Sequence, residues 1–562
     1  MTNISNAAGK VPLMFRAQVA GRCQLQRIRD LRYEEADEQD AERWTDEWII
    51  KAYPEAPTFG DDVQTRIYSL SWRFVTNGGQ DDGVIRPVIG AKGWPFYPGS
   101  SMKGLFRQAC DPDQADRYCG RSRSNNNYEP GILRFHGGYP TDSRWTEQLL
   151  DIIHPQQERQ VKSSGKSSAF VQISLYQPEL KFGISSMLPL SEGEWQTIWQ
   201  IWESAIASGL GCRVSAGYGQ PEIATRAPLY RTQLEGQGQA AKLIDGTGEF
   251  RPNIFRAAVR GHALRIFGGL TNSDIAEQIV EELFGGISQG QGTFGLLSMA
   301  FEPEGLDLDV FRQSRYEEPI YDVKGQLFWS LTQPLADDAK VALTKLIEAL
   351  TRFAMILGGF GKSWRRADHR LVYPEYYDET HKPLIGCHWQ WSEKRSQIRD
   401  VRVRKLEQVG EFIEEVRQAA RDWMTLRDHP ICENRPANWR EAWHSNNVQV
   451  WGRLAEQGIE DCEAVRWLHG PYRSAIPSVG ISEGSIYQSS ITGQMGQIGR
   501  LWHRMYPCIR LVKDPKNPKR PLPKQTQQYF ELLTLFPDNS PKSIDFLDFL
   551  KNQQNMFQKL WP

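Results

Sequence analysis

The same order of segments occurs twice along this chain of 562 residues, and few architectures can accommodate such a duplication. Each half contains a strand-like stretch, a glycine-rich turn, a helix-like segment and a second strand-like stretch. These segments lie at residues 66–76, 77–83, 100–110 and 131–140 in the first half and at 228–235, 236–250, 255–267 and 292–302 in the second. Glycines pair up between the halves, Gly120 with Gly285 and Gly131 with Gly292. Two domains of one kind explain this pattern best.

Each half continues with a longer amphipathic helix that ends in a cluster of glycines. The first spans residues 192–208, where Trp195, Trp199 and Trp202 fall on one helical face, a spacing that favours a core stripe over a surface for stacking bases. The second spans residues 337–357. A strand, helix, two strands and helix with both helices on one side predict an α+β fold, a ferredoxin-like (RRM-like) βαββαβ domain in each half.

These patterns predict two domains. The first covers residues 1–225 and includes an N-terminal extension, and the second covers residues 226–562. Residues 374–484 read as a mainly helical insertion in the second domain. The β-rich stretches at 485–512 and 527–536 are predicted to supply its last strands.

Composition excludes several classes of protein. With 40% hydrophobic and 24% charged residues, the chain is predicted to be globular, and it has neither an 18-residue apolar run nor a signal-like N-terminus, so we expect a cytoplasmic location and no membrane contact. Its eight cysteines include no CxxC pair. The 67 basic and 68 acidic residues nearly cancel, so any contact with nucleic acid must come from local patches such as residues 510–524, which could equally be a solvated loop.

The string FYPGSSMKGLFRQ, at residues 96–108, is the most specific motif of the chain. It resembles the PGSSLKG-x-x-R segment of the CRISPR-associated RAMP superfamily, in particular the Cas-seven-type backbone subunits of type III effector complexes. The glycine cluster GGFGKSWRRADH at 358–369 and the string TGQMGQIGRLWHRMYP at 492–507 are similar to the glycine-rich loops of that superfamily. Two linked copies look like the tandem backbone subunit of III-D-like effectors.

The resemblance implies that the chain binds a guide CRISPR RNA. Amides at a helix N-terminus attract anions, and glycines let backbone approach a ligand closely. In the second half the Pro-Gly-Ser-Ser string is absent, although an Arg-Gly pair matches the Lys-Gly pair. The residues predicted to contact RNA are Ser100, Ser101, Lys103, Gly104, Arg107, Arg213, Arg260, Gly261, Lys362, Arg365 and Arg366.

The resemblance also implies cleavage of target RNA by an aspartate in the loop before the motif helix. Asp81 and Asp82 lie on that loop in the first half, and Asp245 is the aspartate of the matching loop in the second. Asp245 and Asp81 would hold Mg²⁺ or another divalent cation, which helps to position a ribose hydroxyl against its phosphate. No organic cofactor is expected. An aspartate beside glycine is otherwise an ordinary turn residue.

The sequence therefore predicts an endoribonuclease subunit whose partners are guide RNA, target RNA, other backbone subunits and the large signalling subunit of the complex. Two alternatives stay open. One is a scaffold with the same fold that binds RNA without cutting it. The other is a ribonuclease that processes the guide precursor with His136, His154 or His262 as a general base. His381, Cys387 and His388 lack a second ligand pair, so the sequence predicts no zinc site there.

Overall fold

The computed structural model describes most of the chain. The described residues are 17–20, 24–27, 37–76, 80–81, 84–85, 87–123, 127–153, 157–162, 170–223, 228–243, 246–288, 291–313, 316–378, 382–473, 484–493, 497–515, 517, 520–552 and 556–562. The chain forms two compact units, unit 1 with residues 1–155 and 168–227 and unit 2 with residues 156–167 and 228–562. The predicted domain boundary, between residues 225 and 226, lies outside the described residues.

Unit 1 contains short strands and a few helices. Its strands are β1 (Ala17–Ala20), β2 (Gln24–Arg27), β3 (Gln64–Ser69), β4 (Arg73–Phe74), β5 (Gln80–Asp81), β6 (Val84–Ile85), β7 (Gly120–Arg123), β8 (Asn127–Pro130), β9 (Leu133–Pro140), β10 (Leu150–Ile153), β11 (Phe170–Ile173), β12 (Leu175–Tyr176) and β13 (Glu179–Ser186). Its α-helices are α2 (Asp37–Lys51), α3 (Gly99–Ala109), α4 (Pro112–Gln114) and α6 (Glu192–Ile206), and single helical turns lie at Ala91–Gly93, Ala115–Cys119, Ser143–Thr146 and Val214–Ala216.

An antiparallel sheet of order β3-β13-β9 forms the centre of unit 1. Helix α3 contacts both β9 and α6, and the three elements share one hydrophobic core. Trp199 and Trp202 of α6 are buried, and the Trp202 ring lies 5.1 Å from that of Phe182 in β13. The prediction that the tryptophan stripe belongs to the core is therefore confirmed, as is the predicted helix over the motif.

Unit 2 contains longer strands and most of the helices. Its strands are β14 (Tyr230–Gln239), β15 (Ala241–Lys242), β16 (Gly248–Glu249), β17 (Gly286–Ser288), β18 (Gln291–Thr293), β19 (Leu297–Gln313), β20 (Tyr316–Leu331), β21 (Cys387–Trp391), β22 (Gln449–Ala455), β23 (Leu501–Lys513), β24 (Pro521–Leu535) and β25 (Gln558–Trp561). Its helices are α5 (Gln157–Lys162), α7 (Asn253–Gly268), α8 (Ser273–Phe284), α9 (Asp337–Ile356), α10 (His369–Val372), α11 (Lys394–Arg399), α12 (Gln408–Leu426), α13 (Ala464–His469) and α14 (Pro541–Asn552), with a single turn at Pro374–Tyr377. None of the helices within the described residues is long and apolar enough to cross a bilayer.

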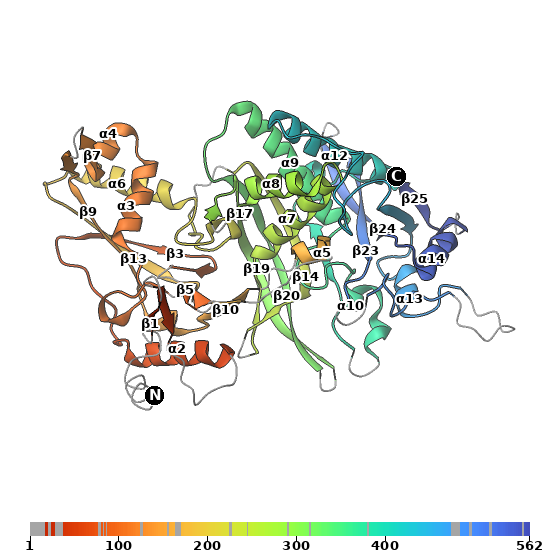
Figure 1. Cartoon of the computed structure of the whole chain (residues 1–562), viewed down its shortest axis with the longest axis horizontal. Helices are drawn as coiled ribbons and strands as arrows, with labels where there is room; N and C mark the ends of the chain where they lie inside the picture. Colours follow the sequence, from red (N-terminus) through yellow and green to blue (C-terminus); the bar gives the residue numbers. More distant parts are fainter. Residues whose placement is uncertain are drawn as a thin grey trace. The chain divides into compact units, whose positions relative to one another are not determined.

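Unit 2 has two separate four-stranded antiparallel sheets. The first has the order β19-β20-β14-β21, with β19 and β20 forming a long hairpin (Figure 1). Buried residues of α7, α8, α9 and α12 share one core with this sheet. The second, here called the C-terminal sheet, has the order β23-β24-β22-β25. In both sheets the chain runs strand, helix, strand, strand, helix, strand, and the strands lie in the order second, third, first, fourth.

The C-terminal sheet corrects one prediction. The strands at 485–512 and 527–536 do not extend the sheet that begins at Tyr230, because β23 pairs with β24, β24 pairs with β22, and β22 pairs with β25. Residues 374–484 are not a helical insertion within one sheet either, since they contain β21 of the first sheet and β22 of the second. The pattern of apolar residues predicted these strands correctly, but it does not show with which other strand each of them pairs.

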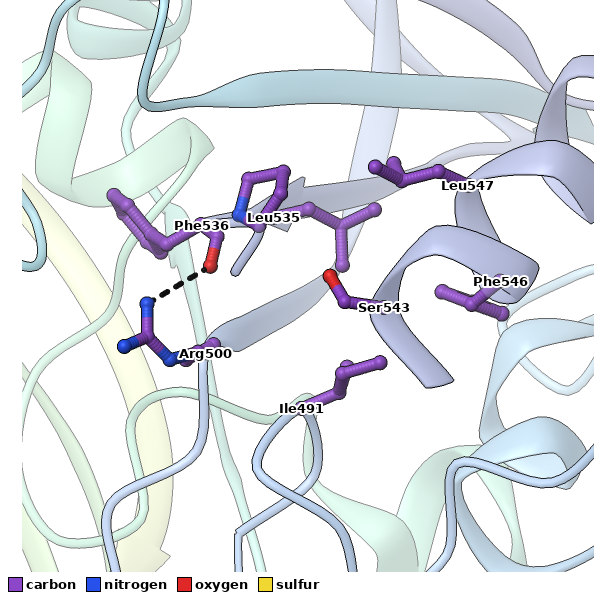
Figure 2. Close-up of a pocket in the computed structure, with 8 residues that line it drawn as sticks. Ile491, Arg500, Leu535, Phe536, Ser543, Phe546 and Leu547 are labelled. Carbon is purple, nitrogen blue, oxygen red and sulfur yellow. Dashed lines mark hydrogen bonds between the residues drawn. The ribbon is translucent and has the colours of Figure 1, made fainter. Parts of the chain in front are cut away.

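A small pocket lies where α14 covers the C-terminal sheet. Figure 2 shows Leu535 of β24 and Phe546 of α14 on its wall, and Arg500 Nη1 donates a hydrogen bond to the carbonyl of Phe536 over 3.3 Å beside it. Its volume of about 10 Å³ is space for about one water molecule. This pocket is therefore too small to bind a nucleotide.

Two glycine pairs show that the halves repeat in their backbone. Gly120 (φ 94°) and Gly285 (φ 74°) each end a helical segment in the left-handed region, where a side chain would be strained. A Cβ on Gly131 would lie 2.5 Å from the Gly120 nitrogen, and a Cβ on Gly295 would lie 2.2 Å from the Gly285 nitrogen. Gly295, and not Gly292 as the sequence suggested, is thus the structural counterpart of Gly131.

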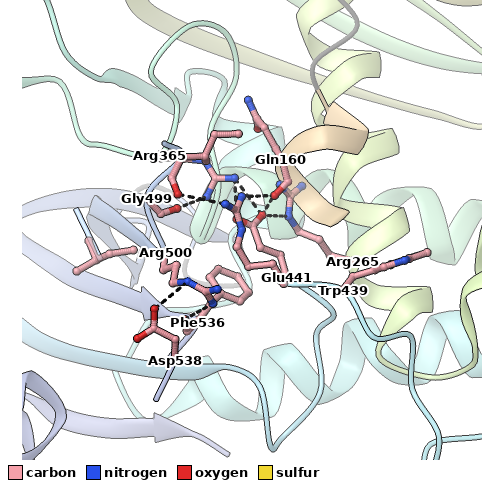
Figure 3. A network of polar contacts seen from close by, with 12 residues as sticks. Gln160, Arg265, Arg365, Trp439, Glu441, Gly499, Arg500, Phe536 and Asp538 are labelled. Carbon is pink, nitrogen blue, oxygen red and sulfur yellow. Dashed lines mark hydrogen bonds and ion pairs between the residues drawn. The ribbon is translucent and has the colours of Figure 1, made fainter. Parts of the chain in front are cut away.

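A buried carboxylate joins the helices of the first sheet to the C-terminal sheet (Figure 3). Glu441 has no exposed surface, and its oxygens accept from Arg265 of α7 (2.7 Å), from Arg365 (2.8 Å) and from Arg440 (3.0 Å). Burial alone would raise the pKa of Glu441, but the three guanidinium charges outweigh it, so the pKa is lowered and the carboxylate is ionised at neutral pH. The Arg265 guanidinium also lies 5.1 Å from the ring of Trp502 in β23.

This arrangement predicts a large loss of stability when the charge of Glu441 is removed. The change Glu441→Gln keeps the shape of the side chain but leaves three buried guanidinium groups without a counter-charge, so we expect the free energy of unfolding to fall by about 3–5 kcal/mol. Chemical denaturation of the purified chain measures it. The control is Asp548→Asn, which breaks an exposed pair with Lys551 and is expected to change stability by less than about 1 kcal/mol. Equal effects of the two changes would contradict the role given to Glu441.

Candidate nucleic-acid interface

The first turn of α3 begins without a capping side chain among the described residues. Pro98 precedes the helix in an extended conformation. The N–H groups of Gly99, Ser100 and Ser101 therefore have no acceptor within the helix, because the first turn never does. Both serines are exposed. Such a turn can hold a phosphate group.

Glycine at position 99 is needed for the helix to begin where it does. A Cβ there would lie 2.0 Å from the carbonyl oxygen of Phe135 in β9, so α3 can approach the sheet this closely only with glycine. Gly104 is different, because a Cβ at this position would meet nothing within 4 Å. The helix surface at Gly104 is therefore open to a ligand.

Lys103 and Arg107 lie one turn apart on α3 and have different surroundings. Lys103 is exposed and makes no ion pair with any described residue. Arg107 donates a hydrogen bond to the Gly120 carbonyl and lies 3.8 Å from the Asp116 carboxylate. Arg256 of α7 makes the corresponding bond in unit 2, to the carbonyl of Phe284 just before Gly285. Arg107 thus ties α3 to the segment that ends at Gly120, which leaves Lys103 as the cation of α3 without an ion pair among the described residues.

The glycine-rich segment after α6 packs against β4. The Cys212 N–H donates to the Val75 carbonyl over 2.9 Å, and the Gly219 N–H donates to the Arg73 carbonyl over 2.7 Å. A Cβ on Gly211 would lie 2.3 Å from the Val75 oxygen. Close contact with β4 therefore accounts for glycine here. Arg213 adopts a left-handed conformation (φ 60°) and is half-buried beside this contact.

Arg260 and Gly261, the predicted counterparts of Lys103 and Gly104, do not occupy the same place on their helix. Lys103 lies in the second turn of α3, whereas Arg260 lies in the third turn of α7. The Arg260 guanidinium donates to Glu158 of α5 over 2.8 Å, and Gly261 is buried. Burial alone would raise the pKa of Glu158, but the hydrogen bond and the charge of Arg260 outweigh this effect and lower it. An RNA contact by this pair stays a prediction.

Three cations of unit 2 gather beside the hairpin of β15 and β16. They are Lys242 of β15, Arg251 just after β16 and Lys362 of the glycine-rich loop, and we call them the hairpin cations. Loss of water around the ammonium group is the largest cause of the lowered pKa of Lys362; the charge of Glu318 opposes the shift, and those of Arg251 and Lys242 add to it. Lys362 was predicted from the sequence and Lys242 and Arg251 were not, although both flank the segment of the sequence that contains Asp245.

Arg365 and Arg366, predicted to contact RNA, are engaged by the protein itself. Arg365 binds Glu441, and Arg366 donates to the carbonyls of Leu501 and Thr492, the latter over 3.0 Å. Burial is the main cause that lowers the pKa of Arg365 to about 10 and that of Arg366 to about 9. The structure thus gives both residues a packing role that the sequence analysis did not foresee.

The predicted catalytic aspartates are only partly visible. Asp82 and Asp245 lie outside the described residues, and of Asp81 only the backbone is described, paired with Val84 between β5 and β6. The described carboxylates near the second loop are already occupied, since Glu249 pairs with Arg251 (2.9 Å) and Glu318 accepts from Gln239 (3.2 Å). No group of three carboxylates converges within the described ranges. The Mg²⁺ site stays a prediction.

The candidate histidine bases differ in exposure. His262 is fully buried, and its ring makes edge contacts with Phe353, Trp364 and Trp502. Burial holds the pKa of His262 well below its usual range. His136 is exposed, with its Nε2 atom 2.8 Å from the Ser185 hydroxyl, and His154 lies outside the described residues. A buried His262 cannot reach an RNA hydroxyl.

The two glycines of the motif helix give a matched test of this geometry. Gly99→Ala must push α3 away from β9, so we expect the free energy of unfolding to fall by about 1–3 kcal/mol. Gly104→Ala meets open space in a helix interior and is expected to raise it by roughly 0.5–1 kcal/mol. Urea unfolding of both variants measures the difference. A stable Gly99→Ala variant would contradict the close approach of α3 to the sheet.

No protein-family model matches the chain, and no curated protein matches it. A solved structure to which the chain is similar is a cryo-EM structure of the type III-B Cmr-beta bound to cognate target RNA and AMPPnP, in the presence of ssDNA. The similarity covers 57% of this chain and 98% of that chain, with 11% sequence identity and a TM-score of 0.26. The likeness is remote, and at this TM-score neither a fold nor an activity carries over from it.

Proposed function

We propose that this chain is a backbone subunit of a type III CRISPR effector complex that binds guide RNA and holds target RNA against it. The observation that carries the proposal is the start of α3. Two exposed serines lie on this helix with N–H groups that no described side chain caps and with Lys103, which pairs with no described acid, and the helix surface at Gly104 is open. Uncapped amides and an exposed cation form a binding site for a phosphate group, and such a site does not depend on the base sequence.

The ferredoxin-like RAMP domain is the fold proposed around the sheet of unit 1 and around each of the two sheets of unit 2. The connectivity of both sheets in unit 2 and the order β3-β13-β9 in unit 1 support it. In unit 2 the corresponding helix, α7, has no Pro-Gly-Ser-Ser string at its start. The hairpin cations would therefore provide the positive charge that attracts the RNA phosphates there. Lys242 and Lys362 lie near a hairpin rather than a helix end, which suits a flexible single strand, whereas Arg251 is tied to Glu249 over 2.9 Å.

Cleavage of the bound target is the second part of the proposal. Asp245 lies in the sequence between β15 and β16, three residues after Lys242, and Asp81 lies in the hairpin of β5 and β6. A divalent cation held there would supply charge stabilisation to the phosphate. The cationic side chains of this protein would hold the RNA strand in place, so that a ribose hydroxyl lies in line with the adjacent phosphate. Other backbone subunits and the large signalling subunit complete the proposed complex.

Processing of the guide precursor is the weaker candidate. That activity needs an accessible general base within hydrogen-bond reach of an RNA hydroxyl. His262 is buried among aromatic rings with a strongly lowered pKa, so it cannot serve. His136 is the described histidine left for this role.

Binding of RNA tests the first part of the proposal. Lys103→Ala removes one phosphate contact, so we expect a several-fold weaker affinity for single-stranded RNA and a decrease of about 0.7 in the slope of log affinity against log salt concentration. Fluorescence anisotropy with the purified chain measures both. Lys340→Ala, at an exposed lysine of α9, is the matched control and is expected to bind as the parent does. An unchanged salt slope for Lys103→Ala would count against the α3 site.

Cleavage by the assembled complex tests the second part. Asp245→Ala and Asp81→Ala are each expected to abolish one cut in the target RNA, while guide binding is kept because neither carboxylate contributes to the attraction of phosphate. Gel analysis of end-labelled target, with Asp82→Ala beside Asp81→Ala, shows which aspartate of the first loop is required. If every cut survives in the Asp245→Ala, Asp81→Ala double variant, the chain is a scaffold and another subunit cleaves.

A further inference from the structure

Three side chains with metal-binding atoms meet inside the C-terminal sheet. Cys462 lies just before α13, His503 lies on β23 and Glu531 lies on β24. The Cys462 sulfur is 3.4 Å from His503 Nε2 and 3.2 Å from Glu531 Oε1, and the latter two atoms are 3.3 Å apart. All three side chains are buried, the histidine and glutamate completely. This is the one group of three possible ligands found within the described ranges.

The separations match the edges of a tetrahedral zinc site. With zinc bonded at about 2.3 Å to sulfur and about 2.0–2.2 Å to nitrogen and oxygen, tetrahedral angles place the ligand atoms about 3.4–3.6 Å from one another. The three atoms of the cluster lie 3.2–3.4 Å apart, nearly as an equilateral triangle. A cation therefore needs only a small outward shift of the side chains to bond all three.

The same geometry excludes a nucleophilic triad. A thiol activated by histidine needs one ring nitrogen at the sulfur and the other at the carboxylate. Here Cys462 and Glu531 both lie at Nε2 of His503, and the Nδ1 atom is buried without a hydrogen-bond partner in the described part of the chain. The ring therefore directs its polar contacts only into the cluster.

The carboxylate is held in place by groups outside the triangle. Glu531 Oε2 accepts from Arg453 of β22 over 2.6 Å and from the Glu463 N–H over 3.1 Å. Glu531 Oε1, which faces the cysteine and the histidine, also accepts from the Ala464 N–H over 2.7 Å. Outer contacts of this kind orient the ligands of metal centres. They bring strand β22 and the start of α13 into the same site.

We propose that Cys462, His503 and Glu531 bind one Zn²⁺ ion, which fastens the start of α13 to β23 and β24. Binding forms a zinc–sulfur bond and releases the thiol proton to solvent, while His503 binds through Nε2 with its ring proton on Nδ1 and Glu531 binds through Oε1. A water molecule takes the fourth position. The mixed sulfur, nitrogen and oxygen set suits zinc and not Mg²⁺, which prefers oxygen ligands. This site is independent of the RNA contacts and of the proposed catalytic aspartates.

Metal analysis of the purified full-length chain tests the proposal. We expect about one zinc per chain by mass spectrometry and, after exchange with Co²⁺, a sulfur-to-cobalt charge-transfer band that requires a bound thiolate. Cys462→Ser should lose the band and most of the zinc. Cys387→Ser is the matched control, because Cys387 is also fully buried but lies against Arg504 and not in the cluster. It should keep both signals, as should Lys103→Ala.

Other outcomes would overturn the site. If the parent chain contains no zinc and, after exposure to Zn²⁺ or Co²⁺, shows neither bound metal nor the charge-transfer band, the three residues are only a buried hydrogen-bonded group. Full zinc content in a folded Cys462→Ser or His503→Asn variant would place the metal elsewhere. Should neither variant fold, the zinc content and the cobalt spectrum of the parent chain decide the matter alone. Loss of RNA binding in Lys103→Ala has no bearing on this result.

Discussion

One buried carboxylate, that of Glu441, faces three guanidinium groups, and the arrangement of unit 2 depends on it. Removing charges from water is unfavourable unless they are paired and hydrogen-bonded, so these residues can be buried only together. Arg265 comes from α7, Arg365 from the glycine-rich loop after α9 and Arg440 from the segment before β22. The same contact therefore holds α7, the glycine-rich loop and the C-terminal sheet together. Because Lys362 belongs to that loop, the contact also positions Lys362 near the β15–β16 hairpin.

The repetition of this chain is preserved in its backbone more than in its charges. Left-handed Gly120 and Gly285 end equivalent segments, and in each unit an arginine donates to a carbonyl at that point. By contrast, Lys103 is exposed and unpaired among described residues, whereas Arg260 is tied to Glu158. Backbone geometry is enforced by sterics, while surface charges are free to change. The two units can therefore share these backbone features and still bind a ligand through different residues.

Sequence patterns predicted what depends on local periodicity and missed what depends on distant partners. The helix over the motif and the buried face of α6 follow from spacing within a few turns. The pairing of β24 with β22 joins strands separated by a long connection, and the contacts of Arg365 depend on Glu441, which lies far along the chain. Cys462, His503 and Glu531 show no ligand spacing at all, because the sheet alone brings them together.

The central claim is that the start of α3 and the hairpin cations hold the sugar-phosphate chain of an RNA. The most direct measurement is photo-crosslinking of the RNA-loaded chain followed by mass spectrometry of the crosslinked peptides. The account predicts crosslinks in peptides that contain residues 98–107 of unit 1 and residues 240–251 or 358–364 of unit 2. Crosslinks confined to other surfaces, for instance to residues 510–524 of the β23–β24 hairpin, would contradict it.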